Sequence, residues 1–129
     1  MAVPLGFIEN PQEMEVVVSG PGDINRLFIY TGTAVFDFKG AGGDWLRDTL
    51  TFEIGRSFTV AQFRSATATA SLASISNVQH AVNAGWAVDR VEASRAASGK
   101  IQLRMNLAVR DVDGYVHRVA FEASVLAKL

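Results

Sequence analysis

The two histidines are the side chains of this sequence best suited to acid–base chemistry near neutral pH. Neither His80 nor His117 has a second histidine or an acidic residue at metal-ligand spacing on its own predicted element. No nucleophile elbow or comparable motif joins a serine to a histidine and an aspartate. His117 shares the inward parity of its predicted strand, near Val109, where a half-buried imidazole is common. We therefore expect no catalytic residues and a protein that is not an enzyme.

Asp111 and Asp113 have the two-residue spacing that recurs between calcium ligands. A calcium-binding loop needs further oxygen ligands and a closing glutamate, but here the chain continues directly into a strand-like segment. A turn between two strands explains Asp113 and Gly114 without a metal. We expect no metal site and no cofactor.

Two tryptophans flank turns that contain glycine, and they are the best candidates for a ligand platform. Trp45 follows the glycine-rich segment 39–44, which ends at Asp44, and Trp86 follows Gly85. Aromatic rings with one wet edge stack on sugars and other planar ligands, although burial in a core or an interface is the commoner fate of tryptophan. The glycine-rich segment lacks the Gly-Lys-Ser/Thr ending of a phosphate-binding loop. The candidate ligand-binding residues are therefore Trp45, Trp86 and Asp44.

The composition indicates a single domain of nearly balanced charge. The 129 residues include 12 Lys plus Arg and 13 Asp plus Glu, so the net charge of −1 offers no basic surface for nucleic acid. Cysteine is absent, which removes disulfides and thiolate chemistry. Residues 1–10 lack the pattern of a signal peptide, and no apolar run reaches the ~20 residues of a spanning helix. We expect a cytoplasmic protein without a membrane span.

The last third of the chain has the clearest strand pattern. Apolar residues alternate over 101–109 and again along 115–125, with Tyr115 on the inward parity of the second segment. A three-residue loop, 112–114, would join the two segments as a hairpin with Met105 opposite Phe121. The same register predicts that Arg104 lies opposite Glu122 and that Gly114 adopts a positive φ.

The segment 26–38 is apolar on both faces of a predicted strand. Such a strand is either central in a layered fold or half covered by another subunit. The high apolar content, 49% of residues, favours an oligomer that would bury the surplus. The candidate interface residues are Phe28, Tyr30, Phe36 and Phe38.

Other segments complete a strand-rich pattern. Further strands are predicted at 14–18, 45–54, from Phe58 with a bulge near 61–62, and at 86–93 with a phase slip between Val88 and Val91. Along 65–72, hydroxyl side chains alternate with small apolar ones, as in some pore-forming strands, but the small size of alanine favours packing beneath bulkier neighbours. A short helix is expected over 76–84, with Ser76 as its cap and Gly85 at its end.

These patterns predict an all-β protein, an antiparallel β-sandwich or jelly roll of about eight strands with at most one short helix. Residues 1–12 are expected to form an N-terminal arm and 13–129 a single β-sandwich domain. The leading functional hypothesis is a non-enzymatic module that acts in self-assembly, as a homo-oligomer or with a partner protein. The alternative is a domain that binds a small ligand or a glycan through Trp45 and Trp86, and a pore-forming or enzymatic role ranks below both.

Overall fold

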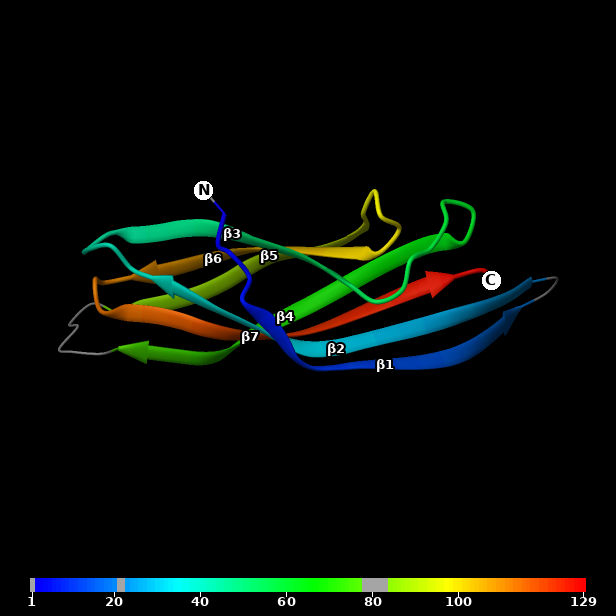
Figure 1. The fold of residues 1–129 in the computed structure, drawn as a ribbon, viewed down its shortest axis with the longest axis horizontal. Coiled ribbons are helices and arrows are strands. Elements are labelled where there is room, and N and C mark those ends of the chain that lie inside the picture. The colour runs from blue at the N-terminus through cyan, green and yellow to red at the C-terminus, as the bar shows by residue number, and fades with distance from the viewer. Residues whose placement is uncertain (1, 21–22, 78–83) are drawn as a thin grey trace.

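The chain forms a two-layer antiparallel β-sandwich in the computed structural model, which describes residues 2–20, 23–77 and 84–129 (Figure 1). Within these ranges there are seven strands and no helix. The first sheet has the order β1 (Phe7–Gly20), β2 (Asp23–Lys39), β7 (Gly114–Ala127), β4 (Phe63–Asn77). The second has the order β3 (Trp45–Ile54), β6 (Ile101–Arg110), β5 (Gly85–Arg95). The predicted all-β sandwich is confirmed, with seven strands in place of about eight.

The core lies between the two sheets and is built from the inward rows of the strands. In β6 the predicted alternation is confirmed, because every second side chain is fully buried. These residues are Ile101, Leu103, Met105, Leu107 and Val109. In β7 the row from Val119 to Val125 is buried in the same way, from the other layer. Both central strands therefore turn their apolar faces toward each other across the sandwich.

The expected hairpin between the last two strands is wrong. β6 pairs with β3 and β5, whereas β7 pairs with β2 and β4, so residues 111–113 cross from one sheet to the other. An alternating apolar face fits a strand that stacks across a core as well as one that pairs beside its neighbour. Placing each strand in the middle of its own sheet gives it two paired neighbours, where a lone hairpin gives only one.

This crossing also changes the predicted pairs and the role of Gly114. The predicted pair of Arg104 and Glu122 is wrong. Arg104 lies opposite Glu92 on β5, and Glu122 lies opposite Thr69 on β4, in the other sheet. Positive φ is found at Asp111, at 83°, and not at Gly114. Gly114 is required for a different reason: a Cβ there would lie 2.7 Å from the backbone oxygen of Arg110.

The strand expected from Phe58 is wrong, because residues 56–59 are irregular and residues 60–62, where the bulge was expected, form a turn before β4. Phe58 is 1% exposed and its ring centroid lies 5.2 Å from that of Phe28, so its side chain is buried at one end of the core. Val60, two residues on, is 77% exposed. In β5 the predicted phase slip is confirmed by a register shift between Asp89 and Glu92.

Two boundaries differ from the expectations. β1 begins at Phe7, so the expected arm is strand over its second half, with a register irregularity between Glu9 and Gln12. β4 continues to Asn77, so Ser76 does not cap a helix, and the rest of the expected helix falls on 78–83, outside the described residues. Within β4 the alanines of 65–72 pack partly against the core while their hydroxyl neighbours are exposed, as small-residue packing predicts.

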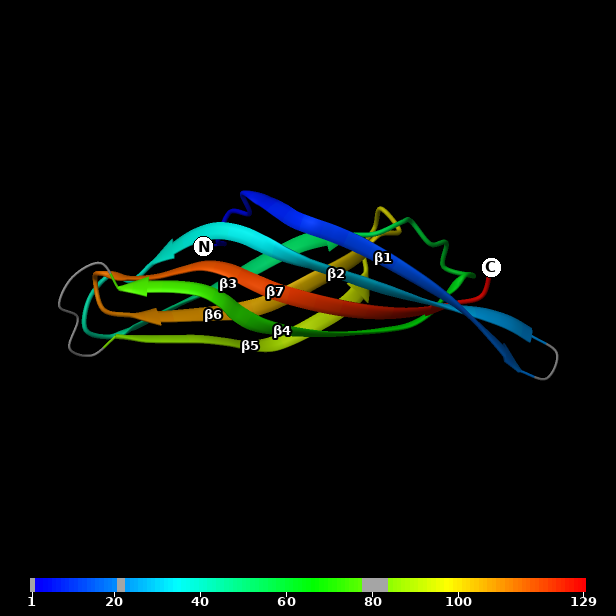
Figure 2. The same cartoon turned by 90° about the horizontal axis from the view of Figure 1, so that it is seen from below.

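The sandwich has one closed side and one side with a cleft. β4 and β5, the edge strands of opposite sheets, lie next to each other on one side, which Figure 2 also shows. On the other side the N-terminal segment runs from β1 to β3, where the backbone N–H of Val3 donates to the carbonyl of Thr49 at 2.9 Å. The cleft described below lies between β1 and β3 beside this segment.

Candidate functional site

Three polar side chains form a hydrogen-bonded relay on the outer face of the first sheet. Ser76 Oγ lies 2.7 Å from His117 Nε2, and His117 Nδ1 lies 2.8 Å from Asp37 Oδ1. The carboxylate accepts from Nδ1–H, which leaves Nε2 to accept the Ser76 proton; this tautomer is assigned from the hydrogen-bond partners. The order serine, imidazole, carboxylate is the one that activates a serine in hydrolases.

The relay depends on a change of parity in β7. Val116 and Val119 are both fully buried although they lie three residues apart, and the register with β2 and β4 shifts in this interval. His117 and Tyr115 are therefore on the outer face, contrary to the expected inward parity, with their rings stacked 5.3 Å apart. Two apolar residues at a spacing of three were the signal in the sequence for this slip.

The environment of the relay is open. The side chain of Asp37 is 79% exposed and that of His117 is 29% exposed. In serine hydrolases the carboxylate that orients the imidazole is buried, and a preorganised set of donors stabilises the oxyanion. The relay thus supplies the proton-transfer geometry, but water competes for its carboxylate.

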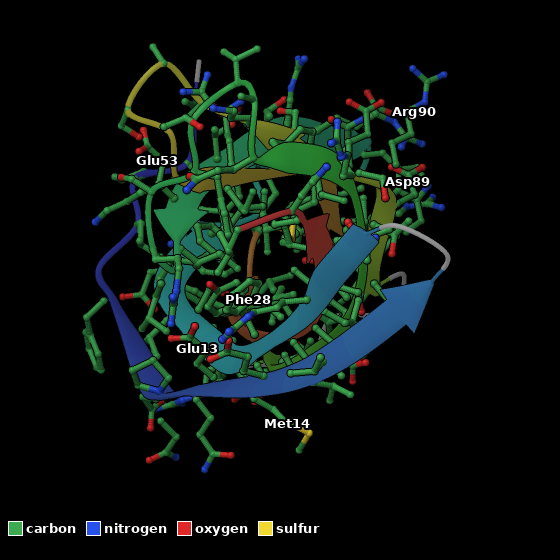
Figure 3. All side chains as sticks on the ribbon, turned by 90° about the vertical axis from the view of Figure 1, so that its right-hand side faces the viewer. Glu13, Met14, Phe28, Glu53, Asp89 and Arg90 are labelled. Carbon is green, nitrogen blue, oxygen red and sulfur yellow. The ribbon has the colours of Figure 1, made fainter. Side chains whose placement is uncertain are left out.

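A second polar group lies in the cleft between β1 and β3. The cleft has a volume of about 370 Å³ and is lined by apolar side chains of both sheets together with Glu13, Tyr30 and Glu53. Figure 3 shows Glu13 on the side of β1 that faces Phe28 and Met14 on the opposite side. The Tyr30 hydroxyl donates to Glu13 Oε1 at 3.3 Å, and Arg56 binds the same carboxylate oxygen from Nη2 at 2.9 Å.

Tyr30 and Arg56 are held at this place by packing as well as by polar contacts. The Arg56 guanidinium lies 4.5 Å above the ring centroid of Phe28, a cation–π distance. Burial raises the pKa of the Tyr30 hydroxyl, and the Glu13 carboxylate raises it further, whereas the hydrogen bond from the Arg56 backbone N–H lowers it. The network ties the edge strand β1 to the turn after β3 through the ion pair between Glu13 and Arg56.

The structure separates Trp86 from the other two predicted ligand-binding residues, Trp45 and Asp44. Trp45 is on the outer face of the second sheet, 42% exposed, and borders a hollow of about 250 Å³ that Asp44 also lines. Trp86 lies opposite the buried Val109, so its ring is on the inner face of the second sheet and packs against the core. The two rings therefore lie on opposite faces of the second sheet and do not form one platform.

The four predicted interface residues are buried inside this chain. Their exposed fractions are 0% for Phe28, 4% for Tyr30, 4% for Phe36 and 7% for Phe38. They fill the core between the sheets and are not available to a partner subunit. The apolar character of 26–38 on its second face comes from residues such as Leu27 and Ile29, which are half-buried on the outer face of the first sheet.

Exposed apolar side chains lie instead on β1, the strand that pairs with β2. Met14 is 60% exposed, and Val16 and Val18 are each 42% exposed. These three residues lie opposite Ile29, Leu27 and Asn25 of β2, so they extend the outer apolar face of the first sheet to its edge. We refer to Met14, Val16 and Val18 as the apolar edge row. Within the described parts of the chain, no strand pairs with the outer side of β1.

No protein-family model, no curated protein and no solved structure matches this chain. Within the described residues, no helix is long and apolar enough to cross a membrane.

Proposed function

We propose that the protein is a self-assembly module whose partner-binding surface is the free edge of β1 with its apolar edge row. The observation that carries this proposal is the exposure of Met14, Val16 and Val18 on the edge strand β1, which is 14 residues long and whose outer side pairs with no strand in the described parts of the chain. An edge strand presents a row of unpaired N–H and C=O groups, and natural proteins usually protect it with charge, proline or a short length. In β1 such protection is limited to the irregular part of the strand between Glu9 and Gln12, which contains Pro11.

The two glutamates near this edge are each paired with an arginine of the same chain. Glu13 is paired with Arg56, and Glu15 is paired with Arg26 of the neighbouring strand. Both glutamates lie on the parity opposite to the apolar edge row. A partner strand that covers the apolar row would not have to bury an unpaired carboxylate.

Light scattering coupled to gel filtration over a dilution series tests the proposal. We expect a discrete multimer for the natural chain and a monomer for the double variant Val16→Lys, Val18→Lys, because lysine on an edge strand opposes pairing. Val60→Lys, at a position 77% exposed in a turn, is the matched control and should keep the multimer. A natural chain that stays monomeric at high micromolar concentration would overturn the proposal.

A ligand-binding role is the second candidate, favoured by the hollow beside Trp45. Only Trp45 and Asp44 of the predicted residues line it. A bound glycan or other planar ligand would quench the fluorescence of Trp45. At 100 times its dissociation constant it would also add about 2.7 kcal/mol of stability, which raises the melting temperature. A screen of glycans and metabolites without either effect removes this candidate.

A hydrolytic role is the third candidate, favoured by the alignment of Ser76, His117 and Asp37. A reactive serine is phosphonylated by a fluorophosphonate, which transfers its phosphorus to Oγ with loss of fluoride and of the serine proton. Labelling of Ser76 in the natural chain, lost in Asp37→Asn, would support this role. Equal labelling of the natural chain and Ser76→Ala, or none at all, would remove it.

A further inference from the structure

Only one part of the β1 edge is regular enough to accept another strand. Asn10 has a φ of 49°, Pro11 has no N–H to donate, and the register with β2 shifts between Glu9 and Gln12. From Gln12 onward the pairing with β2 is continuous to Gly20. The usable edge is therefore Gln12–Gly20, and its central residue is Val16.

We propose that two copies of the chain pair through this edge, antiparallel, with a two-fold axis at Val16. This inference rests on the proposed self-assembly and specifies its partner and register. Val16 then lies opposite the partner's Val16, and Met14 lies opposite the partner's Val18. The ladder of paired residues covers the whole regular edge. It begins with Gln12 opposite the partner's Gly20 and ends with Gly20 opposite the partner's Gln12.

The faces of the strand exclude half of the possible registers. In an antiparallel pair, residues directly opposite each other lie on the same face of the sheet. A shift of one strand by a single residue would place members of the apolar edge row opposite Glu15 or Val17, which lie on the other face of β1. Only registers centred on a residue keep the apolar rows of the two copies together.

Charge and length select among the registers that remain. Centring the pair on Glu15 places that carboxylate opposite the partner's Glu15, and centring it on Met14 places Glu13 opposite the partner's Glu15. Like charges directly opposite each other destabilise a strand pair. Centring it on Val17 restricts the ladder to Met14–Gly20, because the edge ends at Gly20. Val16 is the centre that avoids both penalties.

The resulting dimer has a continuous sheet across both copies. Each first sheet contributes four strands, so the joined sheet has 4 + 4 strands, with β1 of each copy in the middle. The apolar edge rows of both copies meet on its outer face and continue into Leu27 and Ile29 of each copy. The dimer is closed by its two-fold axis, since each copy uses the same edge.

Cysteine cross-linking tests the register, because the natural chain has no cysteine. Residues directly opposite in an antiparallel pair have Cα atoms about 4.5–5.5 Å apart, within the range that a disulfide spans. We expect Val16→Cys to form a disulfide-linked dimer on mild oxidation, which is lost on reduction. Met14→Cys alone is the matched control and should remain uncross-linked, whereas the double variant Met14→Cys, Val18→Cys should cross-link.

The outcomes separate this inference from the proposal on which it rests. A natural chain that is multimeric by light scattering, with Val16→Cys failing to cross-link or Met14→Cys cross-linking equally well, overturns the register and leaves self-assembly standing. A natural chain that is monomeric at high micromolar concentration overturns both. Cross-linking of Val16→Cys and of the double variant, without that of Met14→Cys alone, establishes the two-fold pair.

Discussion

Gly55 faces the ring of Tyr30 so closely that a Cβ at this glycine would lie 2.5 Å from Cζ of the tyrosine. The backbone at Gly55 also has a φ of +77°, in the left-handed region that favours glycine. The turn after β3 can therefore pass beneath Tyr30 and bring Arg56 onto Glu13 only if residue 55 has no side chain.

We predict that Gly55→Ala destabilises the protein by about 1–3 kcal/mol, because it adds backbone strain and displaces the Tyr30 ring. Urea denaturation of both proteins measures the difference. Gly42→Ala is the control, since a Cβ there meets nothing within 4 Å, and it should change the stability by less than about 0.5 kcal/mol. Equal effects of the two substitutions would contradict the close approach of Gly55 to Tyr30.

The raised pKa of Tyr30 predicts a loss of stability in alkaline solution. Burial is its main cause, so the folded protein holds the phenolic proton more tightly than the unfolded chain does. The stabilisation is complete below the unfolded pKa near 10.0 and decreases as the pH rises through the folded value. Tyr30→Phe should remove this part of the alkaline loss.

Denaturation midpoints from about pH 8 to about pH 11 measure this effect. Tyr115→Phe changes the only other tyrosine, so this variant should keep the alkaline loss of the natural chain. If Tyr30→Phe loses stability with pH as steeply as the natural chain does, the loss does not come from Tyr30.

Phe58 should be among the most costly residues to truncate, although it lies in an irregular segment. Its side chain is 1% exposed and contacts Phe28 at the end of the core. We expect Phe58→Ala to lower the free energy of unfolding by about 3–5 kcal/mol through lost burial and a cavity. Val60→Ala, two residues on, should have an effect within about 0.5 kcal/mol, and thermal or urea unfolding distinguishes the two.

The inward rows of the strands could be predicted from the sequence because burial follows the two-residue period. The rows of β6 and of Val119 to Val125 in β7 are confirmed for this reason. The pairing of these strands could not be predicted, since their pattern fits both a hairpin and a crossing between sheets. Phe58 shows the same limit, because its apolar neighbours gave it the pattern of a strand although it lies in an irregular segment with its side chain buried in the core.

The candidate sites were less predictable because each depends on contacts between distant segments. Ser76, His117 and Asp37 come from three strands, and the relay exists only because β7 changes parity before Val119. The aromatic row of 26–38 was correctly identified as apolar but belongs to the core. The surface that we propose for a partner lies on β1 instead, and the edge position of β1 follows from strand order and not from local sequence.

The opposite placement of the two tryptophans gives a test that also bears on the ligand-binding candidate. Trp45 is 42% exposed, whereas Trp86 packs against the core and its Nε1 has no hydrogen-bond partner among the described protein atoms. Iodide should therefore quench Trp45 strongly and Trp86 weakly.

The single variants separate the two signals. Trp45→Phe should leave a blue-shifted emission that iodide barely quenches, because the remaining indole is shielded from water. Trp86→Phe should leave an emission from Trp45 that iodide quenches readily. If both variants are quenched equally, the rings are equally accessible and the separation of the two faces is contradicted. If it holds, a ligand that stacks in the hollow beside Asp44 changes the emission of Trp45 alone, which limits that candidate to one aromatic ring.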